Sequence, residues 1–337
     1  MAAVARRRVI VPPAIAPLPS PPPAAETASL HGETMGTTWS VRLVVPPGRD
    51  LGAIRAGIQG RLDRVVAAMS PWLAGSDLCR FNAAPAGTWQ ALPPALHRVL
   101  AAALAMARAS GGAYDPTVGP LVDLWGFGPA GPRDAAPTAA AIAAARARVG
   151  WQRIELDGAG RARHPGQAGI DLCAIAKGFA VDDVAAWLAR GGIGNVLVEV
   201  GGELSGRGVK PDGRPWWVAV EAPPDARGLD QTVVALHGLS VATSGDYRRF
   251  FDDDSGVRRA HTIDPRTGWP AAHPLASVTV VHPSCMMADA LATALTVLGP
   301  ADGPRFARRE GIAALFVARD GAGHAETLTP ALAAMLD

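Results

Sequence analysis

The pattern of apolar and polar positions predicts a strand and then two helices in the first third of the chain. Side chains alternate along 38–45, where β-branched residues are frequent, and this predicts a strand. Apolar residues then recur at helical spacing over 51–70, so a helix is expected after a proline-containing turn. A second helix is predicted over about 94–110, ended by Gly111 and Gly112.

The rest of the chain mixes helices with strands, and several predicted strands follow one another directly. Helices are predicted over 137–149, 175–190 and 286–298, and strands over 153–157, 168–172, 196–200, 216–221, 232–236, 240–243, 276–281 and 313–317. This order favours an α+β fold, with mixed sheets and packed helices, over a doubly wound parallel sheet. No run of eighteen apolar residues occurs, so no membrane-spanning helix is expected.

The first residues differ in composition from the rest. Proline-rich sequence over 1–28 predicts a disordered leader, and a single domain is expected over 29–337. Three arginines precede a short apolar run that prolines interrupt, which is not a convincing signal peptide. No cysteine precedes Cys79, so a lipid anchor would have no attachment residue. A cytoplasmic location is therefore expected over a periplasmic one, and export stays open.

Charge and cysteine content argue against several classes of function. The chain has 32 Lys and Arg against 30 Asp and Glu, a formal net charge of +2, and no long basic run after the first residues. Electrostatics therefore gives no reason to expect nucleic-acid binding. The three cysteines, Cys79, Cys173 and Cys285, lie far apart and predict neither a disulfide framework nor a zinc site.

Glycine-containing turns in the first half of the chain are candidates for ligand contact. A Gly-Thr-Thr turn follows Met35, and the loop over 110–129 is dense in glycine, proline and aromatic residues around Tyr114 and Asp115. Glycine allows close approach of a backbone to a ligand, and aromatic rings provide stacking faces. Ordinary strand entry and a structural loop are the alternatives.

Phosphate chemistry is suggested by a lysine near the start of a predicted helix. Asp171 ends a predicted strand, and the helix that follows carries Lys177, which we expect in its first turn. A helix N-terminus with a lysine is suited to phosphate, although this is not a Walker loop. The alternative is a solvated lysine on a helix.

Two polar turns later in the chain bring together hydroxyls, an aspartate and a histidine. The first contains Thr243, Ser244 and Asp246, and the second begins at His261 and includes Asp264. Histidine transfers protons near neutral pH, so His261 is a candidate base. A lone histidine would more often be structural, but its polar neighbours favour function.

A predicted helix over 286–298 carries an aspartate and a threonine four residues apart. Asp289 and Thr293 therefore lie on one face, while the helix is apolar almost all round and should be buried. A buried carboxylate needs a partner, and carboxylate and hydroxyl oxygens are ligands that Mg²⁺ prefers. The alternative is that Asp289 caps the helix.

Taken together, these segments resemble the ApbE family of FAD:protein FMN transferases, over about residues 33–300. The resemblance rests on Met35-Gly-Thr-Thr, Ser76-Asp-Leu-Cys-Arg-Phe-Asn, Ser110-Gly-Gly-Ala-Tyr-Asp-Pro-Thr, Asp171-Leu-Cys-Ala-Ile-Ala-Lys-Gly, Gly201-Gly-Glu, Ala242-Thr-Ser-Gly-Asp-Tyr, His261-Thr-Ile-Asp-Pro-Arg-Thr-Gly and Ala288-Asp-Ala-Leu-Ala-Thr. It implies an α+β, T-fold-related architecture and Mg²⁺-dependent transfer of FMN from FAD to a threonine or serine of a target flavoprotein.

The resemblance also implies site roles. The FAD pocket would be lined by Met35, Trp72, Ala113, Tyr114, Asp115, Asp171, Lys177, Thr243, Ser244 and Ile263. Mg²⁺ would be held by the Ala174 backbone oxygen, Asp289 and Thr293, and His261 lies where the family has a candidate proton acceptor. The mechanism we expect adds Lys177, which would stabilise charge, and Asp246 or Asp264 as less favoured bases. The family often has tyrosine where Trp72 stands, and both residues can stack on a ring. Hydrolysis of FAD to FMN and AMP, and flavin binding without turnover, are the competing hypotheses.

Overall fold

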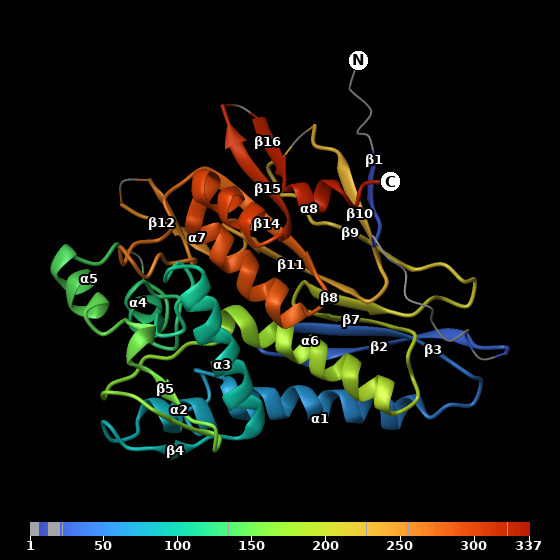
Figure 1. The fold of residues 1–337 in the computed structure, drawn as a ribbon, viewed down its shortest axis with the longest axis horizontal. Coiled ribbons are helices and arrows are strands. Elements are labelled where there is room, and N and C mark those ends of the chain that lie inside the picture. Colours follow the sequence, from blue (N-terminus) through green and yellow to red (C-terminus); the bar gives the residue numbers. More distant parts are fainter. Residues whose placement is uncertain are drawn as a thin grey trace.

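An eight-stranded sheet forms the centre of the molecule in this computed structural model, which describes residues 7–12, 21, 23–133, 135–226, 228–254, 256–321 and 323–337 (Figure 1). Its strand order is β16-β15-β14-β11-β8-β7-β3-β2, and every neighbouring pair is antiparallel. The bounds are β2 Glu26–Thr34, β3 Thr37–Val45, β7 Val196–Val200, β8 Glu203–Arg207, β11 Leu239–Gly245, β14 Leu275–His282, β15 Ala313–Asp320 and β16 Gly323–Leu328.

Helices cover one face of this sheet and a smaller sheet covers the other (Figure 1). On the helical face, α6 (Cys173–Arg190) packs against α7 (Cys285–Arg309), and α1 (Leu51–Met69) and α3 (Pro94–Ala109) lie behind them. On the other face lie a three-stranded sheet, in the order β1-β10-β9, and the short helix α8. Their bounds are β1 Arg7–Ile10, β9 Trp216–Ala219, β10 Gln231–Leu236 and α8 Pro330–Ala333.

The alternation of side chains along each strand supplies the two cores. Along β3, Val41, Leu43 and Val45 face the helical core, whereas Val44 points to the core shared with the smaller sheet. The smaller sheet is mixed, because β1 pairs with β10 in parallel and β9 pairs with it antiparallel. The predicted α+β class with mixed sheets and packed helices is confirmed.

Smaller elements surround one end of the helical layer. They are α2 (Asp77–Asn82), α4 (Gly119–Leu124), α5 (Ala139–Arg146), the 3₁₀ turn Trp151–Arg153, β4 (Gln90–Ala91), β5 (Glu155–Leu156), β6 (Arg161–Arg163), β12 (Phe250–Asp252) and β13 (Arg258–Ala260). Figure 1 shows α4, α5 and β12 gathered on the same side of α7. Among the described residues, none of the helices is long and apolar enough to cross a membrane.

Two predictions about which segments are strands or disordered are wrong for described residues. No strand forms over 168–172, because the Ile170 amide and carbonyl pair with the side-chain amide of Asn82 and not with another strand. Disorder over 1–28 is wrong for β1 and from Glu26 on, since Ile10 is fully buried and Arg8 forms an ion pair with Glu326. Residues 1–6, 13–20 and 22 of that segment lie outside the described residues.

Candidate active site

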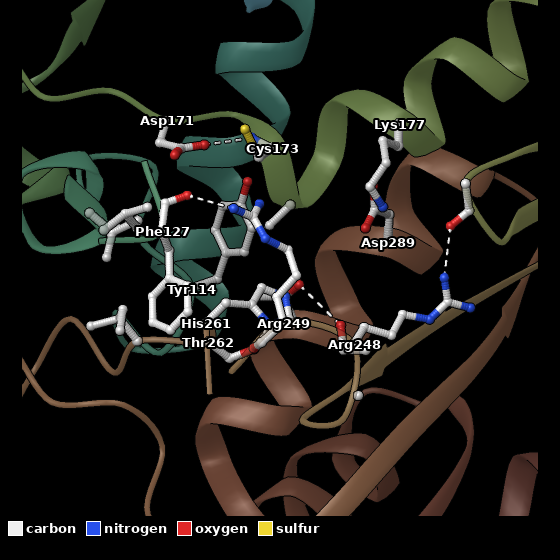
Figure 2. A pocket seen from close by; sticks show the side chains of 18 of the residues that line it. Tyr114, Phe127, Asp171, Cys173, Lys177, Arg248, Arg249, His261, Thr262 and Asp289 are labelled. Atoms are coloured by element: carbon white, nitrogen blue, oxygen red, sulfur yellow. Dashed lines mark hydrogen bonds between the residues drawn. The ribbon is translucent and has the colours of Figure 1, made fainter. Parts of the chain in front are cut away.

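A cavity of about 410 Å³ lies where the ends of α6 and α7 meet β8, β11 and the loop after α3. It collects almost all the residues that the sequence singled out, from segments far apart in the chain (Figure 2). The predicted site residues that line it are Met35, Trp72, Ala113, Tyr114, Asp115, Asp171, Ala174, Lys177, Thr243, Ser244, His261, Ile263, Asp289 and Thr293. Asp246 is absent from this lining.

One end of the cavity is built by the close approach of α6 and α7. A Cβ on Gly178 would lie 2.3 Å from the carbonyl oxygen of Cys285, so only glycine lets the two helices pack this closely. The amide of Gly178 donates to Asp289 Oδ2 at 3.0 Å. Asp289 is only 4% exposed, as its apolar helix predicted. We call this region, with Ala174, Lys177, Asp289 and Thr293, the cation end.

The backbone of α6 is irregular at the cation end. Ala174 has φ −88° and ψ 16°, outside the helical range, in the first turn of the helix. The Gly178 amide, which would pair with the Ala174 carbonyl in a regular helix, donates to Asp289. Lys177 lies in the second turn of α6, and not in the first as predicted, because the helix begins at Cys173.

The donor set at the cation end is made of oxygens of different kinds. No cluster of three or more His, Cys, Asp or Glu suited to a metal occurs among the described residues. Asp289, the Ala174 carbonyl and the Thr293 hydroxyl, which lies 3.3 Å from Ser244 Oγ, instead offer one carboxylate and two neutral oxygens. Carboxylate and neutral oxygens are the ligand types that Mg²⁺ prefers.

Two buried carboxylates flank the Lys177 ammonium. Lys177 forms an ion pair with Glu203, which is 4% exposed at the start of β8. Burial raises the pKa of Asp289, and it raises the pKa of Glu203 to about 7. Burial alone would lower the pKa of Lys177, but the charges of Asp289 and Glu203 outweigh it, so that pKa is raised and the lysine stays cationic.

His261 lies on the opposite side of the cavity, directly after β13. Its Nδ1 is 3.1 Å from the carbonyl oxygen of Arg249, and a carbonyl only accepts, so Nδ1 carries the proton and Nε2 presents a lone pair. Desolvation lowers the pKa of His261 to about 4, so the ring is neutral at pH 7. The Phe127 ring packs edge-on against it, with centroids 6.3 Å apart.

Neither aspartate considered as an alternative base fits that role. Both carboxylate oxygens of Asp246 accept hydrogen bonds from Arg319 on β15, at 2.6 and 3.0 Å. Asp264 is bound in the same way by Arg266, at 2.9 Å. The sequence placed Asp246 within a polar turn, but Asp246 lies just past the end of β11, where the strand alternation stops, and its side chain turns to Arg319 on β15 and not into the cavity.

Other predicted binding residues use their side chains to shape the walls. Asp115 Oδ1 accepts hydrogen bonds from the amide and hydroxyl of Thr117, and Oδ2 accepts from the Trp151 amide. Asp171 Oδ1 accepts from the Cys173 amide at 2.7 Å and so fixes the start of α6. The hydroxyl of Tyr114 is buried without a hydrogen-bond partner among the described residues, so it can bond to a ligand.

Trp72 stands at the rim of the cavity and is 51% exposed. It follows α1 in a turn in which the backbone amide of Trp72 donates to Ser70 Oγ at 3.2 Å. A half-exposed indole beside a cavity offers one face for stacking on a ring. We refer to the partly exposed lining residues Trp72 and His261 together as the mouth of the cavity.

Sequence reasoning missed Glu203, Arg248 and Arg249 as cavity residues. Arg248 forms an ion pair with Glu221 and donates to the Gly201 carbonyl, and Arg249 donates to the carbonyl of Phe127. The pair of glycines before Glu203 was a usable signal, because a tight turn there delivers the next side chain into the site. The two arginines end the polar segment around Thr243, Ser244 and Asp246 and were part of its signal, but no role of their own followed from the sequence, since adjacent charged residues usually face solvent.

Comparisons with known proteins agree on one family. The model of the ApbE family matches residues 35–316. The FAD:protein FMN transferase of Klebsiella pneumoniae (strain 342) is 38% identical over 313 residues, which cover 91% of this chain and 89% of that protein. The corresponding protein of Escherichia coli (strain K12) is 34% identical over 318 residues, covering 93% and 90%.

Solved structures agree as well. The flavinyl transferase ApbE of Pseudomonas stutzeri, in its apo form, has a TM-score of 0.85 and 41% identity, covering 92% of this chain and 97% of that one. The flavin transferase ApbE of Vibrio cholerae has a TM-score of 0.86 and 36% identity, covering 93% and 100%. Sequence and structure thus match along almost the whole length of these proteins, and the chain belongs to the ApbE family.

Proposed function

We propose that this enzyme transfers FMN from FAD to a threonine or serine hydroxyl of a target flavoprotein and releases AMP, with Mg²⁺ as cofactor. The observation that carries the proposal is the pairing, within one cavity, of a buried oxygen-rich cation end with a neutral histidine at the mouth. Relatives that are more than a third identical over nine tenths of this chain are FAD:protein FMN transferases.

The cavity suits a dinucleotide with a charged centre and two ring systems. Lys177 supplies positive charge for the pyrophosphate, next to the start of α6. Trp72 supplies a stacking face at the rim, and the unpartnered Tyr114 hydroxyl can accept or donate a hydrogen bond inside. Met35, Ala113 and Ile263 add apolar wall, so ring systems can be excluded from water.

The donor set fits a hard divalent cation. Asp289, the Ala174 carbonyl and the Thr293 hydroxyl would hold it. Asp289 is buried, and among the described residues its one hydrogen bond comes from Gly178. When bound, Mg²⁺ would neutralise the charge that develops on the phosphate oxygens during transfer.

The protein's own groups supply the remaining chemistry. The hydroxyl oxygen of the acceptor attacks the phosphorus of the FMN half, a new P–O ester bond forms, and the bond to the AMP phosphate oxygen breaks. His261 Nε2 accepts the hydroxyl proton, while the proton on Nδ1 stays there and is donated in a hydrogen bond to the Arg249 carbonyl. Lys177 stabilises the charge on the departing AMP, and the Glu203 ion pair holds it in place.

Mass spectrometry of an acceptor flavoprotein tests the proposal. After incubation with this enzyme, FAD and Mg²⁺, the acceptor should gain the mass of one FMN, and chelation of Mg²⁺ should prevent the gain. Free FMN and AMP without modified acceptor would mean that the enzyme is an FAD pyrophosphatase. Intact FAD, with an acceptor that a related transferase does modify, would mean flavin binding without turnover.

A further inference from the structure

The ammonium of Lys177 lies between two buried carboxylates but pairs with only one of them. Figure 2 shows Lys177 and Asp289 next to each other at the cation end. The hydrogen-bonded ion pair of Lys177 is nevertheless with Glu203, and no ion pair joins it to Asp289 among the described residues. Asp289 receives its hydrogen bond from the Gly178 amide instead.

The fold holds Glu203 in place from a different element than Asp289. Glu203 begins β8 directly after the turn at Gly201 and Gly202, whose φ angles of 60° and 101° favour glycine. The Gly201 amide donates to the Thr38 carbonyl, and the Gly202 amide donates to Glu199 Oε1. Glu203 therefore reaches Lys177 from the sheet, whereas Asp289 faces it from α7.

A contribution to stability does not explain Glu203. Its side chain is 5% exposed, and its Oε2 is buried without a hydrogen-bond partner among the described residues. Removing a carboxylate and an ammonium from water costs several kcal/mol for each ion, and their attraction often only offsets this cost. The buried Glu203 is better explained by its effect on the neighbouring charges of Lys177 and Asp289.

We infer that Glu203 is a positioning residue that holds the Lys177 ammonium off Asp289 and so keeps the Asp289 carboxylate available to the divalent cation. The inference rests on the proposed function, because it concerns the cation of that same site. Without Glu203, the nearest anion for Lys177 is Asp289, and an ammonium on that carboxylate would occupy the place of the metal. With Glu203, the ammonium is paired from the β8 side, and the Asp289 carboxylate keeps only the hydrogen bond from the Gly178 amide among the described residues.

Binding of Mn²⁺ to the full-length protein without FAD, measured by electron paramagnetic resonance, tests this directly. Glu203→Gln should weaken Mn²⁺ binding about 10- to 100-fold, the range found when groups that support metal ligands are lost. The double variant Glu203→Gln with Lys177→Met should recover most of the affinity, because the competing ammonium is gone. Glu221→Gln, which removes the acid paired with Arg248 beside the same cavity, should bind Mn²⁺ like the unaltered protein.

Each result separates the role of Glu203 from the cation site itself. Unchanged Mn²⁺ affinity in Glu203→Gln would overturn the inference. A loss that the double variant does not recover would also overturn it, since Glu203 would then act as a ligand or through the fold. Asp289→Asn that binds Mn²⁺ as the unaltered protein does would instead reject the proposed cation site, whatever Glu203 does. Circular dichroism of each variant checks that it is folded.

Discussion

The cation end and the mouth of the cavity are built in opposite ways. The cation end sits between two long helices whose contact tolerates no side chain at Gly178, and Asp289 there is 4% exposed. The mouth is carried by turns, one of them directly after the short strand β13, with Trp72 51% exposed and His261 half-buried. Charges that must stay at fixed distances are held by buried helices, whereas the side at which we propose that the acceptor hydroxyl enters is made of loops.

The largest effect is expected from Asp289→Asn, which changes the cation end alone. It removes the charged oxygen of the cation end, and we expect transfer to fall at least about 1,000-fold, since the developing phosphate charge loses its main counter-ion. The initial rate of FMN gain by the acceptor, measured across Mg²⁺ concentrations, checks this.

A matched control lies on the same helix. Asp302→Asn removes an aspartate beyond the kink at Gly299, where the side chain is 66% exposed and pairs with Arg305. It should leave the rate and its Mg²⁺ dependence unchanged. Equal rates in Asp289→Asn and Asp302→Asn would remove Asp289 from the cation site.

The corresponding change at the mouth is His261→Ala, which should lower kcat about 100- to 10,000-fold, as loss of a general base does. Because desolvation lowers its pKa to about 4, His261 is neutral and able to accept a proton above that value, and the ability is lost as pH falls through it. The pH profile of the ratio between the rates of the unaltered enzyme and His261→Ala should therefore stay level from pH 7 to 5 and fall near pH 4, because the titration of Glu203, with a pKa of about 7, is common to both proteins.

One outcome of this measurement would contradict the lowered pKa of His261. A fall centred near pH 6.5 would mean that His261 titrates as an ordinary exposed histidine. FAD affinity, measured by equilibrium dialysis in the absence of acceptor, should be similar in His261→Ala and the unaltered enzyme, because the base acts on the acceptor hydroxyl and not on FAD.

Gly178→Ala tests whether the cation end depends on the close contact of α6 and α7, because the new methyl group strains only that end. The new methyl group would lie 2.3 Å from the Cys285 carbonyl oxygen, so α6 and α7 must separate. Such overpacking costs about 1–3 kcal/mol of unfolding free energy, and it should also displace Asp289 from Ala174 and weaken Mn²⁺ binding.

Urea denaturation measures the stability, with Gly60→Ala as control. Gly60 lies within α1, and a Cβ there would meet no atom within 4 Å. Alanine has the higher helix propensity, so Gly60→Ala should raise stability by up to about 1 kcal/mol. A Gly178→Ala protein as stable as Gly60→Ala would refute the close helix contact.

The smallest effect is expected at the rim. Trp72→Ala removes a half-exposed stacking face, so FAD should bind about three- to tenfold more weakly, corresponding to roughly 0.5–1.5 kcal/mol for an aromatic pair. Trp217 on β9 is similarly exposed, at 44%, but lies outside the cavity lining, so Trp217→Ala serves as control. Fluorescence titration of FAD with both variants compares them, and equal affinities would take Trp72 out of the binding site.

Local pattern was enough to predict most regular elements and many site residues. Helical spacing identified α1 and α3, alternation identified β3 and β7, and the apolar surroundings of Asp289 predicted its burial. These features depend on neighbours a few residues away, and the sequence contains that information directly. The family motifs added expected roles for residues such as Ala174, whose backbone oxygen could not be singled out from the side-chain pattern.

Strand pairing, hydrogen bonds and ion pairs between distant segments depend on the tertiary structure. The strand predicted over 168–172 did not form because Asn82 satisfies its backbone, and β1 formed because β10 offered an edge. In the same way, Asp246 forms an ion pair with Arg319, and Lys177 forms one with Glu203. The sequence by itself determined which side chains are available and which local structures carry them, whereas the partner of each buried charge depended on the fold, because electrostatic interactions act through space.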